Sequence, residues 1–187
     1  MMGWNEEIKK QLGGCGERVR IGHNVIITQP QNVYLGDDVR IDPFTLITSK
    51  LETGNYVHIC SHVVCGGSGC TVRLGHWTFL GYGSKLFTES EDYSGNYGPV
   101  NEEWSGNRTD SEDIEIGNYG GIASECVLFP GVKLKEGTCV SIGNTVRKKH
   151  AKRMKPFCVY HGSPPRVLCV RNESHLRNYK WTENKSG

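Results

Sequence analysis

Two histidines that lie close together in the sequence have the type and spacing that general acid–base chemistry uses. His58 lies in the segment Tyr56-Val57-His58-Ile59, one residue before an aliphatic side chain, and His62 follows four residues later. An imidazole readily exchanges a proton near neutral pH, so His58 is the first candidate for a general base and His62 the second. Two alternatives stay open: His58 makes only structural hydrogen bonds, or no histidine acts as a base.

The cysteines indicate reduced thiols rather than a cross-linked or zinc-binding scaffold. No Cys-x-x-Cys pair occurs among the eight cysteines, and no apolar stretch follows a basic start, which favours a cytoplasmic protein without a signal peptide. The segment Cys60-Ser-His62-Val-Val-Cys65 contains residue types that bind metals. Cys65, however, falls on an inward position of the repeat described next, so structural cysteines are predicted and no metal is expected.

A six-residue repeat predicts the elements that must position these side chains. Every sixth residue is aliphatic in one long stretch, namely Ile116, Ile122, Leu128, Leu134, Val140 and Val146. The same register occurs earlier at Leu35, Ile41, Ile47, Thr53, Ile59 and Cys65. Period six fits neither an amphipathic helix nor simple strand alternation, whereas a three-sided solenoid places one inward residue on each side. We therefore predict an all-β parallel solenoid, with Asn, Asp and Gly providing left-handed backbone conformations at its corners.

The repeat also predicts the domain organisation. Turn-like units begin at residues 35, 53, 74, 116 and 134, and the long step from 74 to 116 leaves room for an insertion at about 89–112. Carboxylates and aromatic side chains in that insertion suit the hydroxyl groups and apolar faces of a sugar ring. We expect a capping helix within residues 1–17, the solenoid at 18–170 and a polar tail at 171–187.

Composition argues against two classes of protein. Lys and Arg number 22 against 20 Asp and Glu, and this net charge of +2 does not suggest a dedicated nucleic-acid binder. No apolar run approaches the roughly 18 residues that a membrane span needs. The basic run at 147–155 is accordingly expected to be a solvated end of the solenoid that binds phosphates.

The hexads and three motifs resemble the left-handed β-helix acyltransferases of the hexapeptide-repeat family over most of the chain. The segment Ile116-Gly-Asn-Tyr-Gly-Gly-Ile followed by Pro130-Gly-Val is similar to a coil motif of that family, and His161-Gly-Ser-Pro-Pro-Arg-Val resembles its closing motif. Glu91-Asp92-Tyr93-Ser94-Gly95 resembles the DDYSG loop of its sugar acetyltransferases. The left-handed crossover is implied by the resemblance alone, because general chirality rules favour the other hand.

The resemblance implies acetyl-CoA as the donor and a homotrimer with active sites between neighbouring subunits. The positions that match coenzyme A contacts of the family are Ala123, Ser124, Ile142, Arg147, Lys148 and Arg166. An exposed backbone amide near Ala123 would bind the thioester or pantetheine, and the basic side chains would bind phosphates. The loop motif assigns acceptor binding to Asp92 and Tyr93. Galactoside-type members have their catalytic histidine in this loop, which here contains none, and members carry a segment similar to that of His58 where subunits meet.

The chain is therefore expected to be an acetyl-CoA-dependent sugar acetyltransferase. A neutral amine is already nucleophilic and needs less help from a base than a hydroxyl does, so the missing loop histidine favours N-acetylation of a nucleotide-linked amino sugar. O-acetylation of a free sugar or polysaccharide is the first alternative. The second is a non-catalytic β-helix that serves as an assembly or binding module.

Overall fold

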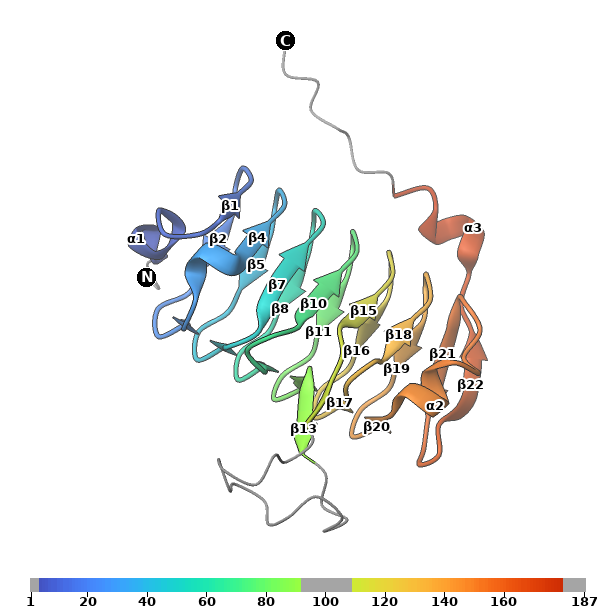
Figure 1. Cartoon of the computed structure of the whole chain (residues 1–187). Helices are drawn as coiled ribbons and strands as arrows, with labels where there is room; N and C mark the ends of the chain where they lie inside the picture. The colour runs from blue at the N-terminus through green and yellow to red at the C-terminus, as the bar shows by residue number, and fades with distance from the viewer. Residues whose placement is uncertain (1–3, 92–108, 180–187) are drawn as a thin grey trace.

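The computed structural model describes residues 4–91 and 109–179 and is a three-sided prism of stacked, mostly parallel strands (Figure 1). Sheet 1 contains β1 (Gly14–Cys15), β4 (Val33–Leu35), β7 (Lys50–Thr53), β10 (Thr71–Leu74), β15 (Ile114–Ile116) and β18 (Lys133–Leu134). Sheet 2 contains β2 (Arg20–Ile21), β5 (Arg40–Ile41), β8 (His58–Ile59), β11 (Phe79–Leu80), β16 (Gly121–Ile122), β19 (Cys139–Val140), β21 (Cys158–His161) and β22 (Arg166–Val170). Sheet 3 contains β3 (Ile26–Ile27), β6 (Leu46–Ile47), β9 (Val64–Gly66), β12 (Lys85–Phe87), β17 (Val127–Leu128) and β20 (Thr145–Val146). Within the solenoid the chain passes from one sheet to the next around each coil, which confirms the predicted all-β parallel solenoid.

The hexad positions form the core of the prism. The register of sheet 2 stacks one inward residue of each coil on the next, and the column consists of Ile21, Ile41, Ile59, Leu80, Ile122, Val140 and Tyr160. None of these side chains is more than 5% exposed, and burial of a large aliphatic side chain contributes about 1.5–3 kcal/mol. Thr53 is the half-buried exception among the predicted inward positions, and its hydroxyl accepts a hydrogen bond from the Gly36 amide at 3.2 Å.

At the corners between sheets 1 and 2, Asp38 and Gly137 adopt the left-handed conformation as predicted, with φ of 56° and 67°, but aromatic residues adopt it at three other corners. Tyr56, Trp77 and Tyr119 have φ of 60°, 59° and 58°, although none is Asn, Asp or Gly. A non-glycine residue in this conformation costs about 1–2 kcal/mol. Two contacts between coils offset that cost: each amide donates to a carbonyl of the preceding coil, as from Tyr56 to Asp37 at 2.8 Å, and the Tyr56 and Trp77 rings stack at 4.1 Å.

The asparagines and aspartates next to these residues have a different role from the predicted one. The Asn55 side chain accepts a hydrogen bond from the Asp37 amide at 3.0 Å, and the Asn118 side chain accepts one from the His76 amide at 2.9 Å. His76 occupies the equivalent corner position in its own coil, and its Nδ1 accepts a hydrogen bond from the Asn55 amide at 2.9 Å. These side chains therefore connect successive coils along the corner.

Both ends of the solenoid are covered, and the insertion begins as a hairpin. The predicted N-terminal helix is α1 (Glu6–Lys9), and Asn5 caps it by accepting from the Ile8 amide. Helix α2 (Lys148–Ala151) follows β20, and α3 (Glu173–Leu176) lies in the predicted polar tail. The antiparallel strands β13 (Glu89–Glu91) and β14 (Thr109–Ser111) form the base of the insertion. Asp92 and Tyr93 lie outside the described residues.

Candidate functional site

His58 lies on the outer face of sheet 2, as its position before the inward Ile59 predicts. Strand β8 pairs with β5 on one side and β11 on the other, so His58 is flanked by Arg40 and Phe79. The imidazole is 39% exposed. It stands next to the corner between sheets 2 and 3, here called the 2–3 corner and made of residues 22–25, 42–45, 60–63, 81–84, 123–126 and 141–144.

The structure gives His58 a partner that the sequence analysis did not identify. Asp42, the first corner residue after β5, is 2% exposed, and its Oδ2 lies 2.9 Å from His58 Nε2. The other oxygen of Asp42 accepts from Arg40 Nε at 2.6 Å. A sequence signal for Asp42 exists: in neighbouring coils the same corner position holds a small residue, Gly22 and Gly81 among them, so a carboxylate there is unusual.

These contacts determine which nitrogen of His58 is available for chemistry. A carboxylate that already pairs with a guanidinium is ionised and only accepts hydrogen bonds. The neutral imidazole must then carry its proton on Nε2 and its lone pair on Nδ1. Among the described residues nothing hydrogen-bonds to His58 Nδ1, so this atom is free to take a proton from a substrate.

Cys60 completes a small cluster around His58. Its Sγ lies 3.9 Å from His58 Nε2, and the residue is buried. Burial, and next to it the charge of Asp42, raise the pKa of the Cys60 thiol, so the group stays protonated. Cys65, by contrast, points into the core as predicted, and burial raises its pKa to about 12. The two cysteines therefore cannot share the zinc site considered from the sequence.

His62 lies at the same corner but faces a different neighbour. It has φ of 61°, and its ring stacks on Phe44 with centroids 5.3 Å apart and planes 6° apart. The structure gives it no carboxylate partner within the described residues. The geometry thus distinguishes the two candidates in favour of His58.

Three of the six expected cofactor residues share the 2–3 corner with Asp42. Ala123 and Ser124 follow β16 and Ile142 follows β19, and the Gly143 amide donates to the Ser124 carbonyl at 3.0 Å. Ile142 is 61% exposed. Strand β11 separates β8 from β16, and β19 lies one strand further, which places Ala123 and Ser124 about 10 Å and Ile142 about 14 Å from His58 along the prism axis. The Ala123 amide itself donates to the Val140 carbonyl at 2.8 Å, because it belongs to the ladder between coils, so the exposed amide expected near Ala123 would have to be a neighbouring one.

The three basic residues expected to bind phosphates are divided between two depressions. Arg166 and His161 line one of about 420 Å³ next to β22. Arg147 and Lys148 line another of about 410 Å³ beyond β20, where the Arg147 guanidinium lies 4.2 Å from the Phe129 ring centroid and Lys148 Nζ bonds Glu112 at 2.6 Å. A single chain therefore does not bring all six expected cofactor residues into one pocket.

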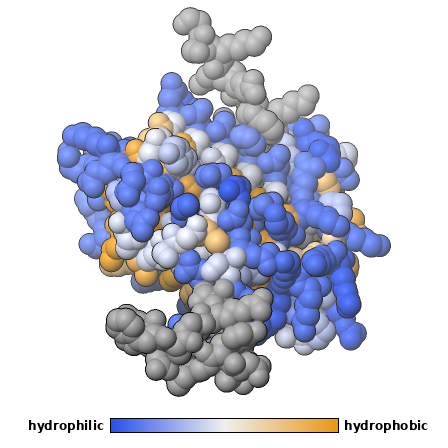
Figure 2. Space-filling model, viewed as in Figure 1, coloured by the Kyte–Doolittle hydropathy of each residue, from blue (hydrophilic) through white to orange (hydrophobic). Residues whose placement is uncertain are grey.

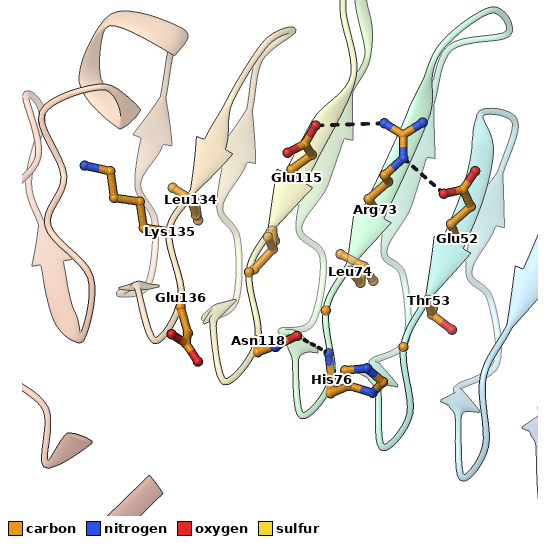
Figure 3. Close-up of a pocket in the computed structure, with 14 residues that line it drawn as sticks. Glu52, Thr53, Arg73, Leu74, His76, Glu115, Asn118, Leu134, Lys135 and Glu136 are labelled. Atoms are coloured by element: carbon orange, nitrogen blue, oxygen red, sulfur yellow. Dashed lines mark hydrogen bonds and ion pairs between the residues drawn. The ribbon is translucent and has the colours of Figure 1, made fainter. Parts of the chain in front are cut away.

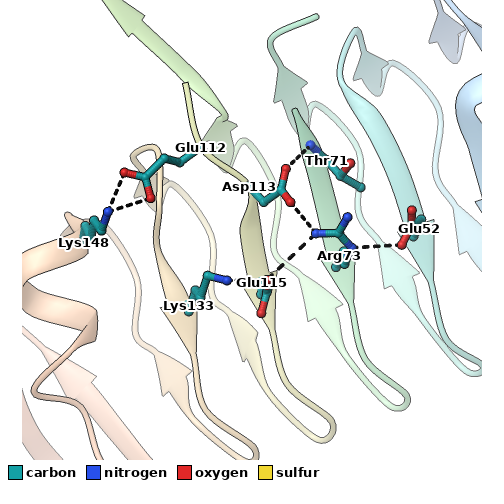
Figure 4. Close-up of polar contacts among 8 residues, drawn as sticks. All are labelled: Glu52, Thr71, Arg73, Glu112, Asp113, Glu115, Lys133 and Lys148. Carbon is teal, nitrogen blue, oxygen red and sulfur yellow. Dashed lines mark hydrogen bonds and ion pairs between the residues drawn. The ribbon is translucent and has the colours of Figure 1, made fainter. Parts of the chain in front are cut away.

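Sheet 1 holds a further depression, of about 550 Å³, which the sequence analysis did not identify (Figure 3). Arg73, Glu52 and Glu115 in its lining are paired with one another or with the adjacent Asp113 and Lys133. Arg73 bonds Asp113 at 2.5 Å and Glu52 at 3.0 Å, and Lys133 bonds Glu115 at 2.6 Å (Figure 4). His76 points to this depression, but its Nδ1 already accepts the Asn55 amide, so the ring is part of the corner ladder.

Large apolar side chains are exposed around the 2–3 corner. Phe44, Tyr82 and Ile142 are each more than half exposed, and Phe79 beside His58 is 38% exposed. Figure 2 shows hydrophobic residues at the surface among hydrophilic ones on the face in view. Within the described ranges, no helix combines the length and the apolar character needed to cross a membrane.

Comparisons with known proteins agree with this architecture. The dTDP-4-amino-4,6-dideoxy-D-glucose acyltransferase of Escherichia coli is 26% identical over 183 residues, which cover 94% of this chain and 92% of that protein. The structure of AntD, an N-acyltransferase from Bacillus cereus in complex with dTDP and 3-hydroxybutyryl-CoA, has a TM-score of 0.83 at 23% identity and 95% coverage of each chain. A hexapeptide-repeat acetyltransferase from Vibrio cholerae, in complex with acetyl coenzyme A, has a TM-score of 0.59 at 15% identity, over 89% of this chain and 75% of that one. No protein-family profile matches the chain. The predicted left-handed β-helix fold is confirmed.

Proposed function

We propose that the protein is an N-acyltransferase that moves an acyl group from a coenzyme A thioester to the amino group of a dTDP-linked 4-amino-4,6-dideoxy sugar. The observation that carries this proposal is the match to the Escherichia coli acyltransferase, which extends over nearly the whole of both chains. The structural likeness to AntD, again over 95% of each chain, supports it. The acyl group is left open beyond acetyl, since AntD is seen with a hydroxybutyryl thioester.

His58 is the general base of the proposed reaction. The sugar amine attacks the thioester carbonyl carbon, and Nδ1 of His58 takes the proton that the nitrogen loses. The C–S bond then breaks, and the proton returns from Nδ1 to the departing coenzyme A thiolate. Asp42, held by Arg40, keeps the other proton on Nε2 and stabilises the imidazolium that forms between these steps.

The other expected residues have roles that follow from their places. Ser124 and Ile142 line the path of the pantetheine along the 2–3 corner, and Arg166 binds phosphate beside it. Arg147 and Lys148 belong to the same site only if a second subunit brings the two depressions together, as the expected homotrimer would. Asp92 and Tyr93 bind the sugar acceptor. The proposed reaction takes place in the cytoplasm.

One assay tests the proposal against both alternatives. Purified protein is incubated with acetyl-CoA and, in separate reactions, dTDP-4-amino-4,6-dideoxyglucose, maltose, or no acceptor, and the acylated product is separated by chromatography. We expect product only with the amino sugar. Product with maltose alone would support O-acetylation, and no product in any reaction, also when 3-hydroxybutyryl-CoA replaces acetyl-CoA, would support a non-catalytic role.

A further inference from the structure

Three different metal-ligating groups converge at the 2–3 corner. The ligand atoms of Asp42, His58 and Cys60 all lie within 4.8 Å of one another. They come from adjacent coils, Asp42 from the corner after β5 and the other two from β8 and the corner after it. The proposed acyl transfer uses Asp42 and His58 but has no role for Cys60.

We propose that these three side chains form an inhibitory Zn²⁺ site, with Asp42 Oδ2, His58 Nε2 and Cys60 Sγ as ligands and the fourth position open to solvent. Thiolate, imidazole and carboxylate are the ligands that zinc takes in proteins, and three protein ligands with one open position are common.

The spacing of the ligand atoms fits such a site. Tetrahedral zinc with ordinary bond lengths sets imidazole nitrogen and carboxylate oxygen about 3.3 Å apart, and nitrogen and sulfur about 3.6 Å apart. The structure has 2.9 Å and 3.9 Å for these pairs. For these two pairs, side-chain shifts of a few tenths of an ångström are enough. The third pair, the Asp42 carboxylate oxygen and Cys60 Sγ, lies within 4.8 Å against about 3.6 Å in tetrahedral zinc, so it must close by up to about 1.2 Å.

The surroundings leave the site accessible. The His58 ring is 39% exposed, so an ion can enter from its side, whereas Asp42 is almost fully buried. Arg40 bonds only Oδ1 of Asp42 and leaves Oδ2 for His58 or the metal. The Arg40 charge opposes the cation, which favours reversible binding over a permanent structural ion.

The consequence for activity rests on the proposed function. When zinc binds His58 Nε2, the proton of that nitrogen moves through solvent to Nδ1, and Cys60 releases its proton to solvent. No electron is transferred. The Nδ1 lone pair, which accepts the substrate proton in the proposed reaction, is thereby lost, so the bound ion inhibits acyl transfer.

Metal binding is tested without reference to activity. Protein treated with EDTA and then desalted is titrated with Co²⁺, and the thiolate-to-cobalt charge-transfer band is followed in the near ultraviolet. We expect the band in a Cys15→Ser/Cys169→Ser double variant, which removes the two exposed thiols, and its loss in Cys60→Ser. A band unchanged by Cys60→Ser, or absent from the double variant, would overturn the site.

A measurement on the unmodified chain covers the case in which Cys60→Ser fails to fold. The protein is alkylated with iodoacetamide with and without Zn²⁺, and each cysteine is quantified by mass spectrometry. We expect zinc to slow modification of Cys60 at least fivefold and to leave Cys15 within twofold. Equal rates at Cys60 with and without zinc would contradict the proposal.

Inhibition is measured as acylated product, because zinc also binds the coenzyme A thiol. We expect Zn²⁺ to inhibit the wild type reversibly, with recovery on addition of EDTA, and Cys60→Ser to need at least tenfold more zinc for half inhibition. If the enzyme turns over but Cys60→Ser is inhibited equally, this inference fails and the proposed function stands. If no acceptor is acylated, the proposed function fails, and the cobalt and alkylation results still decide whether the site exists.

Discussion

The outer face of sheet 1 and the 2–3 corner use charged residues in opposite ways. On sheet 1, Arg73 lies between Glu52 and Asp113, and Lys133 is paired with Glu115, so the charges there largely neutralise one another (Figure 4). At the 2–3 corner, a buried Asp42 is paired with Arg40 on one side, and its other oxygen orients the half-exposed ring of His58. On sheet 1 the charged groups are paired with one another, whereas at the 2–3 corner Nδ1 of His58 has no hydrogen-bond partner among the described residues.

The two surfaces differ in how deeply the carboxylates are buried and in which group each carboxylate bonds. On sheet 1 the carboxylates are partly exposed and bond Arg or Lys, whereas the buried Asp42 also bonds His58. Exposed ion pairs contribute about 0–1 kcal/mol each because water screens them. A buried carboxylate instead fixes the tautomer and orientation of whatever it bonds. Substitutions on the two surfaces should therefore separate activity from stability.

The largest effect is expected at the 2–3 corner for His58→Asn. Asn keeps a polar side chain of similar reach but cannot take a proton, so kcat with the amino sugar should fall about 10²–10⁴-fold. Initial rates of product formation measure this. His62→Asn is the matched control and should change kcat by less than about threefold; equal losses in both variants would remove the distinction between the two histidines.

A smaller loss is expected for Asp42→Asn, since Asp42 acts through His58. The amide retains the shape but no longer fixes the proton on Nε2, so kcat should fall about 10- to 100-fold with little change in KM. Nitrogen NMR of the His58 ring should show the Nε2–H tautomer in the wild type and a mixture in the variant. A single unchanged tautomer would show that Asp42 does not position the ring.

Arg73→Ala on sheet 1 should affect stability and leave activity unchanged. It removes the guanidinium between Glu52 and Asp113, and because these groups are partly exposed the loss should be about 1 kcal/mol. Thermal unfolding should show a Tm lower by about 2–4 °C. A kcat reduced more than about threefold would mean that the depression on sheet 1 takes part in the reaction.

The smallest effect concerns acid stability on sheet 1. The Thr71 amide, and next to it the Arg73 guanidinium, lower the pKa of Asp113 below its usual 3.8. The stabilisation is therefore complete above about pH 5 and is lost as the pH falls through the lowered folded pKa. Since Asp113 is about a third exposed, screening limits the contribution to about 0.5–1 kcal/mol. Asp113→Asn should remove this part of the pH dependence in urea unfolding between pH 3 and pH 6, and an unchanged profile would contradict it.

The hexads predicted the backbone of this molecule well because a solenoid repeats the same local environment. The inward orientation of residues such as Ile41 and Ile59, and the outward orientation of His58, follow from the six-residue period. The bond from His58 to Asp42 crosses from a flat side to a corner of the neighbouring coil and depends on side-chain rotamers, which period six does not encode.

Two other features were not predicted because they also depend on contacts between coils or between subunits. The aromatic residues at the corners, such as Tyr56 and Trp77, adopt left-handed conformations where a backbone hydrogen bond and ring stacking between coils together offset the conformational cost. The separation of Arg166 from Arg147 was not predicted because family motifs align positions along the chain and say nothing of which corner each residue reaches. Whether those two depressions meet depends on neighbouring subunits.

The strand pairing of the prism continues without interruption across the long insertion. Val72 pairs directly with Ile114, and the Gly75 amide donates to the Ile116 carbonyl at 2.8 Å, although more than forty residues separate them in the sequence. The hairpin register sets Glu91 opposite Thr109, close enough for a tight turn to join them. The intervening segment can therefore be lengthened, shortened or replaced in evolution without breaking the strand pairing of the prism.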